Sequence, residues 1–334
     1  MSERLRYGVI GLGFIGGMHA RVVAEDPCAK LVAVADLDKS LADTAASTYG
    51  CDAYSNYQDL LKRQDIDAVS ICVPEPYHAT TAIAAANAKK DMLVEKPLAQ
   101  NLSEIHDIMD AVQANDVRIM VGHVLKFDPR YVQLKDAIKS GQLGEISSLT
   151  LKHTNSVVTV QRLLGKISVF YYLGVHDLEW IIDYCKPAKP VKVYCQAVAK
   201  INQYANDVDT IFMIVNFDNG ILANIELNWA HPDNPASGFG LYAEVTGSKG
   251  RGRISIDEQG LEIITRDAVS YPDSLLWPVF NGSLHGDLKC EINHFVQSIQ
   301  NKGPFFVDVD DATLAVALIE AATESIKTGL PVSL

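Results

Sequence analysis

The chain has 334 residues, of which 48% are hydrophobic and 21% charged, a composition typical of a folded globular protein long enough for two domains. Its 29 basic and 41 acidic residues give a formal net charge of −12, which disfavours binding to nucleic acid or to anionic membrane surfaces. No apolar run approaches the ~20 residues that a membrane-spanning helix requires, and we expect no signal peptide because the N-terminus leads directly into a strand.

The cysteines indicate the cellular compartment. Six cysteines are scattered along the chain with no CxxC motif and no paired spacing, which favours reduced, buried thiols over disulfides. The histidines lie too far apart in sequence to suggest a local zinc site. We therefore expect a cytoplasmic protein without a bound metal.

The first strand, expected at Leu5–Ile10, leads into a glycine-rich stretch. Gly11, Gly13 and Gly16 have the GxGxxG spacing, and a helix is expected over 16–24. In such a loop Gly11 permits the tight turn, Gly13 lets the backbone approach a pyrophosphate, and Gly16 allows close packing of helix on strand. The helix N-terminus offers N–H groups and a partial positive charge to the phosphates. The alternative is an ordinary glycine-rich turn.

A second buried strand, expected at Leu31–Ala35, ends at Asp36. This residue stands 20 positions beyond Gly16, where a carboxylate would accept hydrogen bonds from the adenosine ribose hydroxyls. A carboxylate repels a 2′-phosphate, and the next residue, Leu37, is not an arginine that could bind one. The sequence therefore predicts NAD over NADP. Asp36 could also, or instead, cap the helix that follows.

Strands and helices continue to alternate through about Val124, which is typical of a parallel doubly wound sheet. The expected helices cover 41–49, 57–63, 79–90 and 103–115, the last with Ser103 as its N-cap, and the further strands cover 67–73, 92–94 and 117–121. The Pro74–His78 loop and the triplet Glu95-Lys96-Pro97 each follow a strand, at the sheet edge where ligands bind in open α/β folds. Lys96 is either a residue of the cofactor site or a surface lysine at a strand end.

Beyond Val124 the pattern changes to consecutive strands. After an expected helix over 130–139, strands are expected at 146–153, 191–199, 211–217, 221–229, 241–245, 253–256 and 261–265, and two helices, at 286–300 and 312–328, close the chain. Asp218-Asn219-Gly220 predicts a hairpin turn between two of these strands. The predicted fold class is α/β, with an N-terminal Rossmann domain at 1–124 and an α+β domain with a large, mainly antiparallel open sheet at 125–334.

One helix, expected over 171–182, interrupts this strand-rich half. Tyr172 and His176 are four residues apart, so both are expected on one helical face. Buried polar groups need partners or a purpose, and a tyrosine with a histidine can move a proton. The alternative is a core histidine bonded to a neighbouring carboxylate.

Four motifs, in this order, resemble the Gfo/Idh/MocA oxidoreductases, the sugar and inositol dehydrogenase superfamily. They are Gly11 to Gly16, Glu95-Lys96-Pro97, Phe127-Asp128-Pro129 and Gly174-Val175-His176-Asp177. The resemblance covers essentially the whole chain, and the Glu-Lys-Pro triplet together with the later helix histidine is its most specific part. It implies a Rossmann domain followed by an α/β domain with an open sheet, whose exposed face usually forms dimers or tetramers.

The resemblance also implies roles for single residues. Lys96 matches the catalytic lysine of the family, and His176 matches the histidine that exchanges a proton with the substrate hydroxyl. Tyr172 stands where the family's commonest pattern has an Asp, and it would orient His176 or relay the proton. Glu95 and the loop from Pro74 match segments that wrap the nicotinamide ribose, although Glu75 replaces the usual Asn. These departures leave the particular polyol or sugar open.

The predicted sites follow from these motifs. The predicted cofactor site comprises Gly11, Gly13, Phe14, Ile15, Gly16, Asp36, Leu37, Val73, Pro74, Glu75, His78, Glu95 and Lys96. The predicted catalytic residues are Lys96, His176 and Tyr172, and the predicted substrate site comprises His123, Lys126, Asn155, Tyr172 and His176.

The predicted reaction is reversible hydride transfer between the nicotinamide of NAD and a carbinol carbon of a sugar, inositol or related polyol. His176 would take the hydroxyl proton and Lys96 would stabilise the developing alkoxide. Two alternatives are a non-catalytic dinucleotide-binding sensor and a sugar–sugar oxidoreductase that keeps its cofactor bound. A homodimer or homotetramer through the C-terminal sheet is expected, because a run such as Ile211–Val215 is apolar on both faces of its strand.

Overall fold

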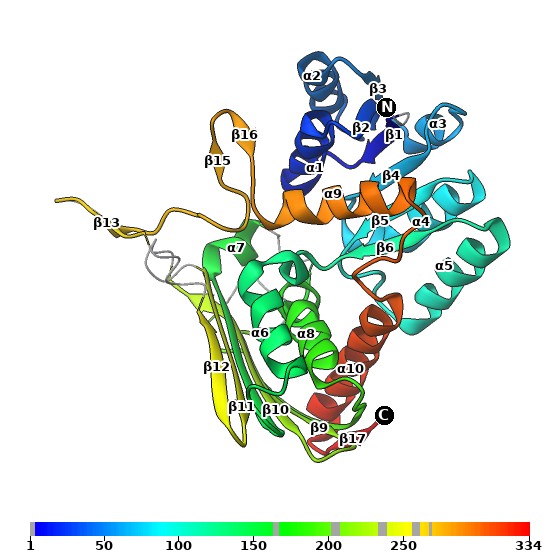
Figure 1. Cartoon of the computed structure of the whole chain (residues 1–334). Helices are drawn as coiled ribbons and strands as arrows, with labels where there is room; N and C mark the ends of the chain where they lie inside the picture. Colours follow the sequence, from blue (N-terminus) through cyan, green and yellow to red (C-terminus); the bar gives the residue numbers. More distant parts are fainter. Residues whose placement is uncertain (1–3, 163–166, 202–207, 233–238, 256–260, 267–268) are drawn as a thin grey trace. The chain divides into compact units, whose positions relative to one another are not determined.

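The computed structural model describes residues 4–162, 167–201, 208–232, 239–255, 261–266 and 269–334, and the chain forms two compact units (Figure 1). The first unit runs through Phe127 and takes in Leu276–Thr313, and the second unit comprises Asp128–Leu275 and Leu314–Leu334. The first unit thus includes a segment that we had assigned to the second domain. Within the described ranges, no helix has both the length and the apolar character needed to cross a membrane.

The first unit contains a six-stranded parallel sheet, as predicted. Its order is β3-β2-β1-β4-β5-β6, and every neighbouring pair is parallel. The strands are β1 (Leu5–Ile10), β2 (Ala29–Ala35), β3 (Asp52–Tyr54), β4 (Ala68–Ile71), β5 (Asp91–Glu95) and β6 (Ile119–Gly122). Apart from β3, which is partly exposed, these strands are almost entirely buried, as is typical of a parallel sheet covered on both faces. Only the short β3 was missing from the prediction.

The helices of this unit lie close to their predicted positions. They are α1 (Phe14–Glu25), α2 (Lys39–Tyr49), α3 (Tyr57–Leu61), α4 (His78–Asn87), α5 (Leu102–Asn115) and α9 (Asp287–Gln300), with short 3₁₀ turns η1 (Glu75–Tyr77) and η2 (Val124–Phe127). The prediction of Ser103 as the cap of α5 was wrong: Asn101 caps it by accepting a hydrogen bond from the Glu104 N–H at 2.9 Å. Asp38, rather than Asp36, caps α2.

The late segment is fixed to the first unit by hydrogen bonds from side chains to backbone. Arg118, just before β6, donates from Nη1 to the Ser298 carbonyl at 2.7 Å, and the Gln300 amide donates to the Cys28 carbonyl at 3.0 Å. Helix α9 packs beside α1 (Figure 1). A small hairpin of β15 (Val279–Phe280) and β16 (Ser283–Leu284) precedes α9. Helix α9 is therefore part of the cofactor-binding unit, although it is distant from it in sequence.

The second unit contains a seven-stranded mixed sheet of order β12-β11-β7-β10-β9-β8-β17. The strands are β7 (Ile146–Ser156), β8 (Pro190–Val198), β9 (Thr210–Phe217), β10 (Leu222–His231), β11 (Phe239–Gly247), β12 (Gly250–Ser255) and β17 (Val332–Ser333). All neighbouring pairs are antiparallel except β7 and β10, so the mainly antiparallel prediction is confirmed. Gly220, with φ of +89°, occupies the predicted hairpin turn between β9 and β10.

Two predicted strands differ in the structure. Ile256, the expected end of β12, lies outside the described residues. The strand expected over 261–265 is reduced to β13 (Ile263–Ile264), which among the described residues pairs with β14 (Val269–Ser270) in a separate two-stranded sheet. The residues around β13 are exposed, so this strand has no core to fix its length.

Helices cover one face of the second sheet (Figure 1). They are α6 (Pro129–Lys139), α8 (Val175–Cys185) and the later part of α10 (Val309–Thr328), while α7 (Val157–Arg162) follows β7 directly. The predicted helix over 171–182 begins as a π turn, η3 (Phe170–Gly174), before α8 takes over. On the other face of the sheet, large apolar side chains are exposed; they are Tyr194, Val198, Phe212, Ile214 and Leu222.

Candidate active site

The predicted cofactor residues of the first unit lie at one edge of its parallel sheet. The glycine loop follows β1, Asp36 follows β2, the Pro74 loop follows β4, Lys96 follows β5, and His123 follows β6. Because all these strands are parallel, their carboxyl ends share one edge of the sheet. The chain order reverses direction between β1 and β4, and dinucleotides bind at such a switch point.

The three glycines of the loop each have a separate structural reason. Gly11 has φ of +86°, and a Cβ there would lie 2.6 Å from the Cys72 carbonyl oxygen. A Cβ on Gly16 would lie 1.9 Å from the Gly11 carbonyl oxygen, whereas a Cβ on Gly13 would have nothing within 4 Å. Helix α1 begins beside Gly13 with no side-chain cap. The open backbone at Gly13 and the uncapped helix start fit a pyrophosphate group.

Asp36 fixes this loop to the end of β2. Its Oδ2 accepts a hydrogen bond from the Leu12 N–H at 2.6 Å, and its Oδ1 accepts one from the Asp38 N–H at 2.8 Å. A carboxylate has about four acceptor sites, so Asp36 can still accept hydrogen bonds from ribose hydroxyls. Leu37 beside it is 91% exposed. This arrangement fits an unphosphorylated ribose.

His78 joins two loops of the cofactor edge. Its Nε2 lies 2.8 Å from the Val73 carbonyl oxygen, and its Nδ1 lies 2.6 Å from the Pro97 carbonyl oxygen. Because a carbonyl can only accept, each ring nitrogen makes a hydrogen bond here when it carries a hydrogen. The buried His78 ring therefore holds the loop after β4 against the loop after β5.

Lys96 lies between opposing electrostatic effects. Burial lowers the pKa of its amine, while the negative charges of Glu95 and Glu75 act to raise it. Glu75 is itself buried, and its Oε2 has no hydrogen-bond partner among the residues that the structure describes. The Lys96 backbone N–H donates to Oε2 of Glu95 at 3.3 Å. The effect of burial is the larger one, so the pKa of Lys96 is lowered overall, and the two carboxyl groups offset part of that shift.

His123 and Lys126 follow β6 and are both buried. Burial, together with the positive charges of Lys126 and Lys96, lowers the pKa of His123 to about 3, so the ring is neutral near pH 7. The Lys126 amine lies 3.5 Å from Oδ2 of the buried Asp311. Lys126 therefore carries a charge that is already paired within the first unit.

In the second unit, the structure places a histidine that the sequence analysis missed beside His176. His153 on β7 lies with Nδ1 3.0 Å from Oδ2 of Asp177, and its ring centroid is 6.3 Å from that of His176. His153 is therefore a core histidine bonded to a carboxylate, the kind of arrangement that we also considered for His176. The sequence did contain a signal for His153. It lies two residues before Asn155 on the same strand, so the two side chains are on the same face of the sheet.

Tyr172 and Asn155 are placed by local structure. Tyr172 lies in the π turn, so its relation to His176 does not follow α-helical spacing, and its ring is 6.4 Å from the Trp229 ring. The Asn155 side-chain oxygen accepts hydrogen bonds from the Ser156 N–H and the Thr159 hydroxyl, both at 2.8 Å. Asn155 thus shapes the end of β7, and a substrate contact would fall to its amide nitrogen.

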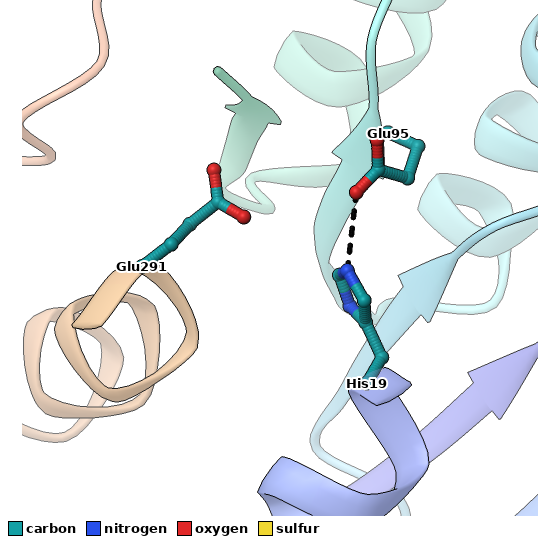
Figure 2. A group of neighbouring side chains, drawn as sticks. All are labelled: His19, Glu95 and Glu291. Atoms are coloured by element: carbon teal, nitrogen blue, oxygen red, sulfur yellow. Dashed lines mark hydrogen bonds and ion pairs between the residues drawn. The ribbon is translucent and has the colours of Figure 1, made fainter. Parts of the chain in front are cut away.

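One buried cluster was missed altogether. His19 on α1, Glu95 on β5 and Glu291 on α9 lie with one polar atom each within 4.8 Å of one another (Figure 2). Among the described residues this is the one group with the side chains and spacing to hold a metal ion, but His19 Nε2 is already 3.1 Å from Oε1 of Glu95. No sequence motif pointed to Glu291, because α9 is far from the glycine loop in sequence.

Comparison with known proteins agrees with this geometry. The sequence matches the family model for an oxidoreductase family with an NAD-binding Rossmann fold over residues 5–123, and the model for the C-terminal alpha/beta domain of an oxidoreductase family over residues 135–334. It is 30% identical over 342 residues to scyllo-inositol 2-dehydrogenase (NAD(+)) of Bacillus subtilis (strain 168), covering 100% of this chain and 97% of that protein.

Two further proteins are similar over nearly their whole lengths. The chain is 28% identical to inositol 2-dehydrogenase of Rhizobium meliloti (strain 1021), covering 96% of this chain and 97% of that protein. Its fold matches the crystal structure of scyllo-inositol dehydrogenase from Lactobacillus casei with bound NAD(H) and scyllo-inositol, with a TM-score of 0.85 at 19% identity over 99% of both chains.

Proposed function

The chain belongs to the Gfo/Idh/MocA oxidoreductase family, with an NAD-binding Rossmann domain, and we propose that it is a dehydrogenase acting on a sugar, inositol or related polyol. The hydride moves between the nicotinamide and a carbinol carbon of that substrate. The relatives named as inositol dehydrogenases support this substrate class, and the particular polyol is left to experiment.

The observation that carries the proposal is the position of Lys96. A lysine in a partly apolar setting lies at the same sheet edge as the glycine loop and Asp36. An ammonium group at this position can stabilise a negative charge that develops on a substrate oxygen beside the nicotinamide, whereas binding of the dinucleotide alone does not require it.

NAD, when bound, supplies the hydride acceptor. Lys96 then stabilises the negative charge that develops on the substrate oxygen, and a fixed charge in a site of low dielectric contributes roughly 3–4 kcal/mol to such stabilisation. His176 takes the hydroxyl proton, which contributes about 10²–10⁴-fold. We propose that Tyr172 orients His176 or relays its proton. His123, Lys126 and Asn155 are our remaining candidates for contacts with substrate hydroxyls.

The test is NADH formation from NAD with a panel of inositols, aldoses, sugar acids and anhydrosugars. The Lys96→Met variant is compared with the unaltered protein and with Lys39→Met, a control at an exposed lysine. We expect one compound to be turned over and turnover to fall by about 10²–10³-fold in Lys96→Met, with NADH binding retained. Equal turnover in Lys96→Met would refute the role of this residue.

A broad panel without turnover in either direction, despite tight NAD binding, would instead establish a sensor. Nucleotide absorbance that survives dialysis of the purified protein would identify a sugar–sugar oxidoreductase. Both outcomes contradict the proposal of a plain dehydrogenase, and each requires only the same purified protein.

We further propose that the exposed face of the second sheet joins copies of the chain into a homodimer or homotetramer. Phe212 and Ile214 on β9 are 51% and 43% exposed, and Tyr194 on β8 lies directly opposite Ile214. Contiguous exposed apolar side chains of this kind mark interaction surfaces. Light scattering should give an oligomer that Phe212→Glu dissociates, and a monomeric unaltered protein would refute the proposal.

We also propose that the protein acts in the cytoplasm. All six cysteines are free thiols, as is usual where the thiol pool is kept reduced. Mass spectrometry of alkylated protein from the native cell should find all six thiols reduced, and a disulfide would contradict this assignment.

A further inference from the structure

A chain of buried hydrogen bonds ends at Glu95, the residue before Lys96. The Tyr7 hydroxyl lies 2.9 Å from the Ser70 hydroxyl, which lies 2.9 Å from Nδ1 of His19. Nε2 of His19 is 3.1 Å from Oε1 of Glu95. Because an ionised carboxylate can only accept, His19 donates from Nε2, and its Nδ1 then accepts from Ser70 when the ring is neutral. Every member of this chain therefore has a partner.

Glu291 lies beside the chain without joining it. It is fully buried, and neither of its carboxyl oxygens has a hydrogen-bond partner in the described part of the protein. Figure 2 shows its carboxyl group pointing into the cluster with Glu95 and His19. The titratable groups around it are Tyr7 from β1, His19 from α1, Cys72 after β4, Glu95 from β5, and Asp287 from its own helix.

None of these neighbours is a lysine or arginine. Burial raises the pKa of the Glu291 carboxyl, and the carboxyls of Glu95 and Asp287 raise it further. A buried carboxylate needs a cation or a proton. A metal ion bound by all three residues of the cluster would need the Nε2 lone pair of His19, and that nitrogen carries the hydrogen donated to Glu95. A proton on Glu291 leaves the hydrogen-bond chain unchanged.

We infer that Glu291 is a neutral carboxylic acid in the folded protein, and that His19 is a positioning residue that keeps the single negative charge of the pair on Glu95, next to Lys96. Gly122 on β6 leaves room for that carboxylate, since a Cβ there would lie 3.1 Å from Oε1 of Glu95. The effect on catalysis rests on the proposed function, whereas the protonation of Glu291 does not.

The first test measures the protonation of Glu291 through stability. A carboxyl whose folded pKa lies above its unfolded value binds a proton more tightly in the folded state. Between those two values, stability therefore falls as pH rises. Glu291→Gln removes this pH-dependent loss of stability, because glutamine has nearly the shape of the neutral acid but does not ionise. We expect the unfolding temperature of this variant, relative to the unaltered protein, to rise by about 2 °C per pH unit as pH increases from about 5 towards the folded pKa of Glu291.

The matched control is Glu25→Gln in the same unit. The Glu25 carboxylate accepts hydrogen bonds from Arg21 at 2.8 Å and from the Leu284 N–H at 2.9 Å, so this variant should not show a rise in relative unfolding temperature with pH. If Glu291→Gln behaves like Glu25→Gln, Glu291 is ionised and the inference is overturned. Elemental analysis that finds one metal ion per chain, lost in Glu291→Gln, would overturn it as well.

The second test compares two amides at position 19. Asn is long enough to replace the bond of His19 to Ser70 but not the bond to Glu95, whereas Gln can reach Glu95. Without its donor, the Glu95 carboxylate is no longer held in place beside Lys96, and its effect of raising the pKa of Lys96 weakens. In His19→Asn, the alkaline limb of the kcat/KM profile should therefore move to lower pH by about one unit, and His19→Gln should restore it.

An unchanged limb in His19→Asn would refute the positioning role. If the unaltered protein turns over no substrate, the proposed function fails, but the pH dependence of stability in Glu291→Gln still decides the state of Glu291. The two failures are therefore distinguishable.

Discussion

Gly16 and Gly17 are adjacent in helix α1 and offer a matched pair of alanine substitutions. A Cβ on Gly16 would lie 1.9 Å from the Gly11 carbonyl oxygen, where ordinary contact begins at 3.4 Å. Backbone atoms must therefore move by roughly 1.5 Å. A Cβ on Gly17 meets only the Leu12 carbonyl oxygen, at 3.9 Å. Both substitutions therefore change helix propensity equally, but only the one at Gly16 creates a steric clash.

Gly17→Ala should raise the free energy of unfolding by about 0.5–1 kcal/mol, because alanine loses less entropy in a helix than glycine. Gly16→Ala gains the same term, but overpacking against the backbone costs about 1–3 kcal/mol or more, so it should be destabilised overall. The displaced loop is the one that carries the open backbone of Gly13. We expect NAD to bind at least about ten-fold more weakly, a loss of about 1.4 kcal/mol.

Thermal unfolding and titration of NAD by fluorescence quenching measure both effects. We expect the free energy of unfolding to rise in Gly17→Ala and to fall in Gly16→Ala. We expect only Gly16→Ala to bind NAD more weakly. If Gly16→Ala binds NAD as tightly as the unaltered protein, the close approach of helix to loop is not what shapes the pyrophosphate site.

Three further predictions concern single side chains. Glu75→Gln removes one of the two carboxylates that raise the pKa of Lys96, so the alkaline limb of kcat/KM should move down by about one pH unit; no movement would show that Glu75 does not act on Lys96. Asp177→Asn weakens a buried hydrogen bond to His153 at 3.0 Å and should cost about 1–3 kcal/mol in urea unfolding, whereas an unchanged unfolding midpoint would contradict a stabilising role for this hydrogen bond. Asp36→Ser should weaken NAD binding by about ten-fold and reduce the ratio of the affinity for NAD to the affinity for NADP, both measured by calorimetry. An unchanged affinity for NAD in this variant would contradict the role of Asp36 at the ribose.

The sequence predicted the first sheet well because its strands are buried on both faces. A run such as Leu31–Ala35 is apolar throughout, and glycines or prolines end several of the segments. The errors in the predicted elements occur where two neighbouring residues are both suitable for the same structural role. Asn101 and Ser103 are both good capping residues, and only the backbone path decides that Asn101 receives the Glu104 N–H. Propensity cannot distinguish such neighbours.

The candidate site was predicted only as far as its motifs are local. Gly11, Asp36 and Lys96 each follow a strand, and the rule for parallel sheets brings them to one edge. Glu291 has no such rule, because α9 joins the first unit after the chain has built most of the second. His153 was read as a strand residue, and its bond to Asp177 depends on the packing of α8 against β7.

Strand β17 (Val332–Ser333) has a structural role at the edge of the second sheet. It closes one side of the second sheet by pairing with β8, with Val332 opposite Val193, and the Leu334 N–H donates to the Val191 carbonyl at 3.1 Å. Removal of this strand would leave the backbone groups of β8 unpaired at a sheet edge, which is a template for aggregation. For protein engineering, a truncation that removes Val332 and Ser333 is therefore expected to destabilise this edge of the sheet and to promote aggregation.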